Sequence, residues 1–185
     1  MRSLVNWALL GLVIDRPSYA YELARRFERE YRDALSLSSV SHVYTALGTL
    51  KDRALVEEVA GTRAGRQPKP HYRATEKGIE DYRQWLVGQI QEDRQRQRLF
   101  VLQLGALMRN PREALRMITL YEQSCLEIAR KLPIASPEAP RGEPGAALTA
   151  RLLAEESRLA VGAKLAWAQY ARRKFAALLE DDGED

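Results

Sequence analysis

The sequence has few of the residues that build disulfides and metal sites. Among its 185 residues, Cys125 is the only cysteine, and His42 and His71 are the only histidines. One cysteine cannot form an intrachain disulfide, which fits a reducing compartment. A structural zinc site usually needs four cysteine or histidine ligands, and neither histidine has a second ligand at a suitable spacing. We therefore expect no disulfide framework, no structural zinc and no cofactor.

The chain also lacks a long hydrophobic run. Its apolar stretch from Leu4 to Ile14 is far shorter than the roughly 20 residues of a membrane span. Asp15, Arg16 and Pro17 follow at once, without the small residues of a signal-peptide cleavage site. We interpret the stretch as a buried first helix. With no targeting segment visible, we expect a cytoplasmic protein that has no membrane partner.

Catalytic motifs are absent as well. The sequence contains no G-x-S-x-G, Walker A, G-x-G-x-x-G or H-E-x-x-H pattern, and Cys125 has no histidine near it in sequence. Adjacent carboxylates such as Glu155 and Glu156 are typical of a solvated helix face. Of the three functions that we consider, an enzyme is therefore supported less than a DNA-binding regulator or a protein-interaction module.

Positive charge, in contrast, is concentrated in one short segment. The net charge is +4, from 29 Lys and Arg against 25 Asp and Glu. Residues 1–75 hold 12 basic and 8 acidic residues, whereas residues 76–185 hold 17 of each. Residues 61–73 have no acidic residue and four basic ones, namely Arg63, Arg66, Lys69 and Arg73. A polyanionic partner should therefore bind the N-terminal part.

Hydrophobic periodicity predicts three helices in that part. The first covers residues 3–14, and the second covers residues 18–31 with Ser18 as its N-cap. The second helix should turn Tyr21, Leu23, Ala24, Phe27 and Tyr31 inward, and Arg25, Arg26 and Arg29 outward. The third begins at the N-cap Ser39 and should bury Val40, Val43, Leu47 and Leu50.

The outward face of the third helix is small and rich in hydrogen-bonding groups. At 100° per residue it carries Ser41, Thr45, Gly48 and Asp52, with His42 and Thr49 on one flank and Tyr44 and Lys51 on the other. Such a helix can enter a DNA major groove, which is about 12 Å wide, and its N-terminal residues would reach bases or phosphates. Alternatively, the same face is an ordinary solvated surface.

Two β-prone runs, Leu55 to Val59 and His71 to Thr75, follow this helix. The segment between them contains two glycines and two prolines, which favour a hairpin with a protruding loop. Three helices followed by a hairpin with a basic tip is the order of a winged helix-turn-helix. The loop cations would neutralise phosphates, or Arg63 and Arg66 would enter the minor groove. A solvated hairpin tip is the alternative.

The C-terminal part is predicted to be helical throughout. Thr75 should cap a long helix whose polar residues 89–98 form a solvated continuation or a hinge. A helix from the N-cap Asn110 to about Leu132 should bury Cys125. After a loop over residues 133–145, a last helix over residues 146–179 should have an apolar stripe of Leu148, Leu152, Leu159, Ala163, Ala166 and Tyr170. A neutral, apolar-striped helical region is typical of a dimerisation domain.

Several motifs together resemble a known family. They are Ser18-Tyr-Ala-Tyr-Glu-Leu, then Ser39-Val-Ser-His-Val-Tyr-Thr-Ala-Leu-Gly-Thr-Leu followed by Ala-Leu-Val-Glu, then Tyr72-Arg-Ala-Thr-Glu-Lys-Gly and Trp85-Leu. Over roughly residues 4–90 they resemble the PadR family of bacterial transcriptional regulators. Ala20 stands where that family usually has glycine. His42 stands where threonine is common, which leaves the base preference open.

The resemblance implies a homodimeric winged-helix repressor that binds palindromic double-stranded DNA and has no enzymatic activity. The expected fold is mainly α with a small β-hairpin (α+β). A winged helix-turn-helix DNA-binding domain would cover residues 1–90, a helical dimerisation domain residues 91–180, and an acidic disordered tail residues 181–185. A small aromatic or apolar effector, held between the two domains near Trp7, Phe100 and Trp167, would release the DNA. The expected DNA-contacting residues are Tyr19, Ser39, Ser41, His42, Tyr44, Thr45, Lys51, Arg63, Arg66 and Lys69.

Overall fold

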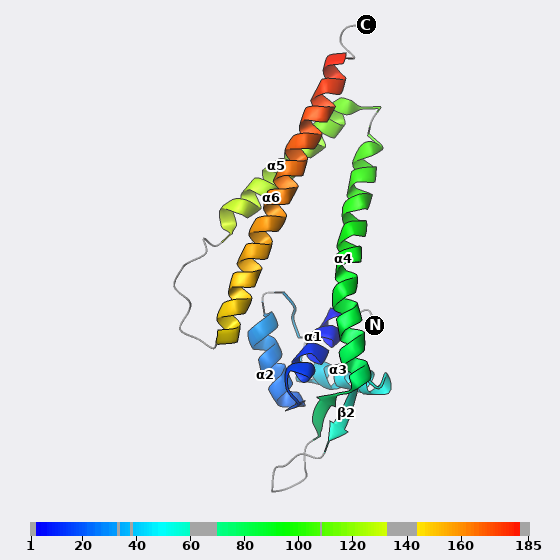
Figure 1. Ribbon diagram of the computed structural model, residues 1–185, viewed down its shortest axis with the longest axis vertical. Coiled ribbons are helices and arrows are strands. Elements are labelled where there is room, and N and C mark those ends of the chain that lie inside the picture. The colour runs from blue at the N-terminus through cyan, green and yellow to red at the C-terminus, as the bar shows by residue number, and fades with distance from the viewer. Residues whose placement is uncertain are drawn as a thin grey trace. The chain divides into compact units, whose positions relative to one another are not determined.

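A computed structural model describes residues 3–32, 34–37, 39–59, 70–107, 109–132 and 144–181. Its elements in chain order are α1 (Leu4–Asp15), β1 (Ser18–Tyr19), α2 (Ala20–Tyr31), α3 (Val40–Asp52), β2 (Val56–Val59), β3 (His71–Ala74), α4 (Glu76–Gly105), α5 (Pro111–Lys131) and α6 (Pro144–Asp181) (Figure 1). The predicted mainly helical fold with a small β element is confirmed. The chain divides into two compact units, which we call the N-terminal unit (residues 1–95) and the C-terminal unit (residues 96–185).

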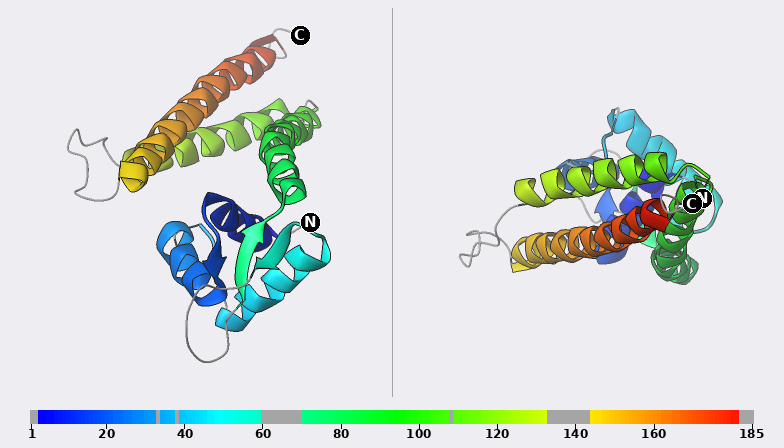
Figure 2. Two further views of the ribbon diagram at one scale, coloured as in Figure 1. Left: turned by 60° about the horizontal axis from the view of Figure 1, so that its bottom comes forward. Right: turned by 90° about the horizontal axis from the view of Figure 1, so that it is seen from above.

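The core of the N-terminal unit forms around α1. Leu9 and Leu10 are completely buried, and α2, α3 and β3 all contact this helix (Figure 2). Because α1 has no polar face, it is stable only when neighbouring elements cover several of its sides. Trp7 of α1 also stacks on Trp85, with ring centroids 4.9 Å apart. The buried first helix is therefore confirmed.

The β element is a three-stranded antiparallel sheet rather than a two-stranded hairpin. Its order is β1-β3-β2, so β3 is the central strand. Ser18 pairs with Tyr72 and Tyr19 with His71. The prediction that Ser18 caps the second helix is therefore wrong: Ser18 is a strand residue, and the N-cap position of α2 is Tyr19. Two paired residues are too short a run for hydrophobic periodicity to reveal.

Polar side chains fix the ends of α3 and α4. The Ser39 hydroxyl accepts the amide of His42, which confirms the predicted N-cap of α3. After α3 the chain reverses through Ala54, whose φ of 56° is left-handed. The Thr75 hydroxyl then donates to the Ala54 carbonyl (2.7 Å) and accepts the Gly78 amide (3.0 Å), which caps α4 as predicted. These contacts join the end of α3 to the beginning of α4.

The predicted burial pattern of α2 needs two corrections. Tyr21 is 61% exposed, because it lies on the side of the helix opposite Leu23. Arg26, predicted to face solvent, is only 4% exposed. Its guanidinium donates to the Asp15 carboxylate at 2.6 Å and to the Ser18 hydroxyl at 3.1 Å. The charge is tolerated in this buried place because it is paired with the last residue of α1 and hydrogen-bonded to the first residue of β1.

The C-terminal unit is built from α5 and α6, which pack along each other, and from the end of α4. Asn110 caps α5 through its side chain and Pro111 occupies the first turn, as predicted. Cys125 is buried, also as predicted. A small buried cluster in this unit contains Leu104, Ala114, Ile118, Ala171 and Phe175. Residues 89–98 are a helical continuation within α4 rather than a break.

The predicted apolar stripe of α6 does not face the core. Leu148, Leu152, Leu159 and Tyr170 are each more than half exposed, and the buried residues are Val161, Ala168, Ala171 and Phe175. At 100° per residue the two sets lie on opposite sides of the helix. The predicted stripe does form an apolar side of α6, but α5 packs against the opposite side of the helix. Of the predicted acidic tail only Asp181, the last residue of α6, lies within the described residues.

Some classes of site are absent from the part of the chain that the structure describes. No helix there is long and apolar enough to cross a membrane. The same residues contain no group of three or more histidine, cysteine or acidic side chains that could hold a metal ion.

Candidate nucleic-acid interface

One face of α3 combines exposure with hydrogen-bonding capacity. Ser41, Tyr44 and Thr45 are exposed and His42 is half-buried, whereas the apolar side of the helix is buried at Val43, Ala46, Leu47 and Leu50. Val40 departs from the predicted inward face, because it is the first residue of α3 and lies beyond the edge of the core, 45% exposed. The helix therefore presents the predicted small polar surface.

The hydroxyl groups on this face have defined hydrogen-bond directions. Thr45 donates to the Ser41 carbonyl at 3.1 Å, and Thr49 donates to the Thr45 carbonyl at 3.0 Å. With their hydrogens directed to the backbone, the two oxygens offer lone pairs to donors outside the helix. In the major groove such donors are the amino groups of adenine and cytosine. Gly48 adds no side chain to this face, and a Cβ built there meets nothing within 4 Å.

Lys51, near the C-terminal end of α3, forms an ion pair. Its ammonium lies 2.8 Å from the Glu58 carboxylate of β2. The hydrogen bond and the negative charge of Glu58 raise the pKa of Lys51. Sequence reasoning selected Lys51 and missed Glu58. The alternation of residues along β2 is only a weak guide to which glutamate faces Lys51, because both Glu57 and Glu58 are exposed.

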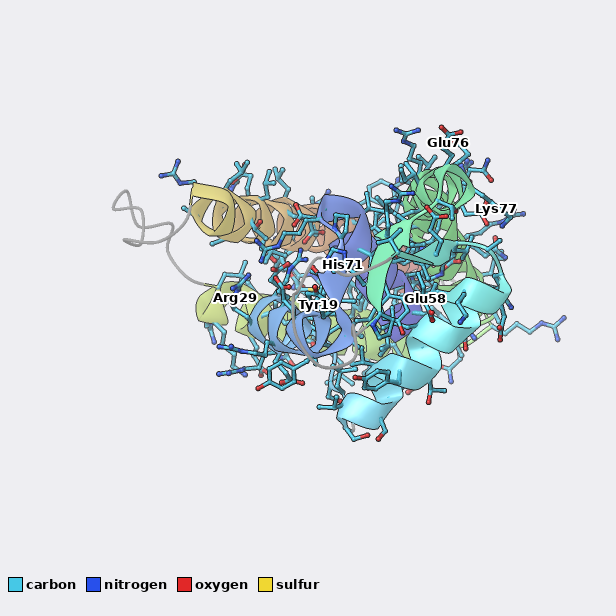
Figure 3. All side chains as sticks on the ribbon, turned by 90° about the horizontal axis from the view of Figure 1, so that it is seen from below. Tyr19, Arg29, Glu58, His71, Glu76 and Lys77 are labelled. Carbon is cyan, nitrogen blue, oxygen red and sulfur yellow. The ribbon has the colours of Figure 1, made fainter. Side chains whose placement is uncertain are left out.

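Tyr19 lies at the base of the predicted wing. Its ring is in contact with the ring of His71, with centroids 4.6 Å apart, and strands β1 and β3 hold the two residues in register (Figure 3). Beside them, Arg73 of β3 donates two hydrogen bonds to Glu57 of β2, at 2.7 and 2.9 Å. The wing residues themselves, Arg63, Arg66 and Lys69, lie outside the described residues.

A cationic pocket, which the sequence did not suggest, adjoins the beginning of α3. It has a volume of about 660 Å³ and lies between the outer face of α2 and Val40. Arg25, Arg29 and Arg32 line it together with Tyr21, Ala24 and Glu28. Among the described residues, Arg25 and Arg32 have no ion-pair partner. Positive charge therefore accompanies the N-terminal end of α3, where residues of a recognition helix approach DNA.

Comparison with known proteins identifies the N-terminal region. Residues 9–84 match the family described as "Transcriptional regulator PadR-like family". Over these residues the chain is similar to the PadR-like family. The matched range runs from the middle of α1 into α4 and therefore includes α3, the sheet and the wing. This is a family of transcriptional regulators rather than of enzymes, and the PadR-like resemblance inferred from the motifs is confirmed.

Solved structures of PadR-like proteins are among those similar to the chain. Bacillus subtilis PadR, in complex with operator DNA, is 15% identical; the match covers 93% of this chain and 99% of that one, with a TM-score of 0.48. A transcriptional regulator from Clostridium thermocellum is 20% identical over 51% of this chain and 87% of its own, with a TM-score of 0.44.

A PadR-like regulator from Bacillus cereus is 16% identical over 52% of this chain and 91% of its own, with a TM-score of 0.43. No curated protein matches the chain. All three TM-scores lie below 0.5, so the likeness to the PadR-like family depends on the match over residues 9–84.

Proposed function

We propose that this PadR-like regulator binds double-stranded DNA in a sequence-specific manner and that α3 is its recognition helix. The observation that carries the proposal is the exposed face of Ser41, Tyr44 and Thr45, which has a hydroxyl on each residue and no carboxylate in the first turn. A helix of this kind fits a major groove without repelling phosphates. Ser39, His42 and Tyr19 would contact the flanking backbone, and Arg63, Arg66 and Lys69 of the wing would neutralise phosphates.

The C-terminal unit supports a homodimer, in which residues 91–180 form the dimerisation domain. Its α6 is apolar on two opposite sides, of which α5 covers one. Exposed apolar residues of this extent mark an interaction surface, and a small core gains stability when a partner covers them. A second copy of the chain would bind a second half-site of a palindromic operator, about 34–36 Å away.

We further propose that the dimer represses transcription in the cytoplasm by occupying its operator, and that a small aromatic or apolar effector releases it. The support is an aromatic cluster of Phe100, Tyr121 and Trp167 with ring centroids 4.8 to 5.8 Å apart. Its three side chains are half-buried, so they can stack with a ligand. Trp7, which the sequence also suggested for the effector site, stacks on Trp85 within the N-terminal unit.

The salt dependence of binding to a duplex tests the DNA-binding proposal. Each phosphate contact contributes about −0.9 to the slope of log K against log salt. Replacing Arg63, Arg66 and Lys69 together by glutamine should flatten this slope by about 2.7 per subunit if all three contact phosphates. The matched control replaces Arg83, Arg94 and Lys77 of α4, three exposed cations outside the proposed interface. An unchanged slope in the wing variant would remove the wing from the interface.

A protein-interaction module without sequence-specific DNA binding is the second candidate. The observation in its favour is that two cations near the sheet, Lys51 and Arg73, are already paired with Glu58 and Glu57. This candidate predicts weak duplex binding that does not depend on base sequence. Sequence-specific binding instead predicts that Thr45→Ala weakens binding to an operator more than binding to random DNA.

A further inference from the structure

Glu58 lies on the side of the sheet that faces the protein interior. Successive strand residues point to opposite faces, so Val56 and Glu58 share one face and Glu57 lies on the other. Val56 is buried, and Tyr72, the cross-strand partner of Glu58, is buried too. Glu58 is therefore an exposed acidic residue on the same side of the sheet as the buried Val56 and Tyr72.

This position brings the Glu58 carboxylate against α3. Its oxygen lies 2.8 Å from the Lys51 ammonium, and both side chains are partly exposed, 42% for Glu58 and 49% for Lys51. Lys51 follows Tyr44 by seven residues, which places both on the same flank of α3. Figure 3 shows Glu58 beside this helix, on the aspect of the unit that also displays Tyr19 and His71.

The ion pair has an electrostatic consequence for DNA. Lys51 is the one basic residue in the last turn of α3, and a duplex phosphate near this flank would be attracted by its charge. Glu58 cancels that charge while the pair is intact, and a phosphate must compete with the carboxylate for the ammonium. Exposed ion pairs contribute little free energy, so a phosphate can compete with the Glu58 carboxylate for the Lys51 ammonium. The outcome of this competition depends on whether Glu58 is present.

We propose that Glu58 is an affinity-limiting residue, which holds Lys51 away from phosphates and weakens the binding of duplex DNA of any sequence. The inference depends on the proposed DNA-binding function and deepens it. It assigns the acidic residue of β2 a role in the interface, and it makes Lys51 a phosphate contact only when Glu58 releases it. Strand β2 is then a part of the DNA-binding surface that acts by pairing with Lys51.

The test measures binding of the full-length protein to a fluorescent 30-base-pair duplex of random sequence between about 50 and 300 mM salt. If Glu58→Gln frees one phosphate contact per subunit, the slope should steepen by about 0.9 per subunit, and affinity at 0.15 M salt should rise about fivefold for each subunit that binds the duplex. Glutamine keeps the size of the side chain, and circular dichroism checks that the fold is unchanged.

Two further variants separate this mechanism from a general charge effect. Glu80→Gln removes an exposed carboxylate on α4 that also lies near an arginine, Arg83, at 3.6 Å, and it should change affinity less than twofold. In a Lys51→Gln background, Glu58→Gln should likewise gain less than twofold, because no lysine is left to be released.

The outcomes distinguish the inference from the function on which it depends. If the wild type binds and Glu58→Gln binds no more tightly, Glu58 does not limit affinity. An equal gain with and without Lys51 would also overturn the inference, because the carboxylate would then act only as a distant charge. If the wild type fails to bind the duplex even at 50 mM salt, both the inference and the proposed function fail.

Discussion

Gly78 lies where α4 begins directly against the backbone that leads into β2. A Cβ built on Gly78 would be 2.1 Å from the carbonyl oxygen of Leu55 and 2.9 Å from its carbonyl carbon. The same carbonyl accepts the amide of Thr75, and the Thr75 hydroxyl accepts the amide of Gly78. Gly78→Ala must therefore separate two backbone segments that hydrogen bonds hold together.

The expected cost follows from two opposing effects. Overpacking typically costs about 1–3 kcal/mol, and we take about 3 kcal/mol because the clashing group is backbone rather than a flexible side chain. Alanine is better than glycine inside a helix by roughly 1 kcal/mol, which offsets part of the cost. Gly78→Ala should therefore lower the free energy of unfolding by about 2 kcal/mol.

Gly88→Ala is the matched control on the same helix. A Cβ at Gly88 meets nothing within 4 Å, so this variant should be more stable than the wild type by up to about 1 kcal/mol. Thermal unfolding followed by circular dichroism compares the two variants. The difference of about 3 kcal/mol corresponds to roughly 6–12 °C for a chain of this size. Equal melting temperatures would refute the close approach of α4 to Leu55.

Three other substitutions test separate contacts. Ala54→Gly should raise the free energy of unfolding by about 0.5–1 kcal/mol in urea titrations, since glycine adopts the left-handed φ of 56° without strain; a loss of stability would contradict this. Asp15→Asn should lower it by about 1–3 kcal/mol, because Arg26 is buried and loses the nearer of its two carboxylates; a neutral result would show that Ser18 and Glu30 suffice. Burial raises the pKa of Tyr31 to about 12 from 10.0, so its contribution to stability is complete below pH 10 and lost as the pH rises through 12. Tyr31→Phe should therefore show a smaller alkaline loss of stability, and an identical loss would contradict the assignment.

Local sequence signals were sufficient for most of the helices. Ser39 and Asn110 cap helices through side-chain oxygens, and such contacts depend only on residues three positions away. The apolar α1 required a buried position in any fold. Elements that depend on distant partners were different. The burial of Arg26 requires Asp15 and Ser18, which come from the preceding helix and strand, and hydrophobic periodicity contains no information about that contact.

In the candidate interface, too, local features could be predicted from the sequence, whereas contacts between distant elements could not. The polar face of α3 followed from helical spacing alone, and the family match over residues 9–84 supports its function. The ion pair of Lys51 with Glu58 depends on how β2 is placed against α3, and the cationic pocket depends on how α2 meets Val40. Both are tertiary arrangements. The two apolar sides of α6 also looked alike in sequence, and only the position of α5 shows which one is uncovered.

We propose that the exposed face of α3 reads base sequence for a symmetric dimer. Selection of bound molecules from a library of random duplexes, followed by sequencing, tests this proposal. The wild type should enrich a two-fold symmetric motif with half-sites about 10 base pairs apart, and Thr45→Ala should change the enriched bases within each half-site. Binding without enrichment of any motif, or an identical motif in the Thr45→Ala selection, would contradict the claim.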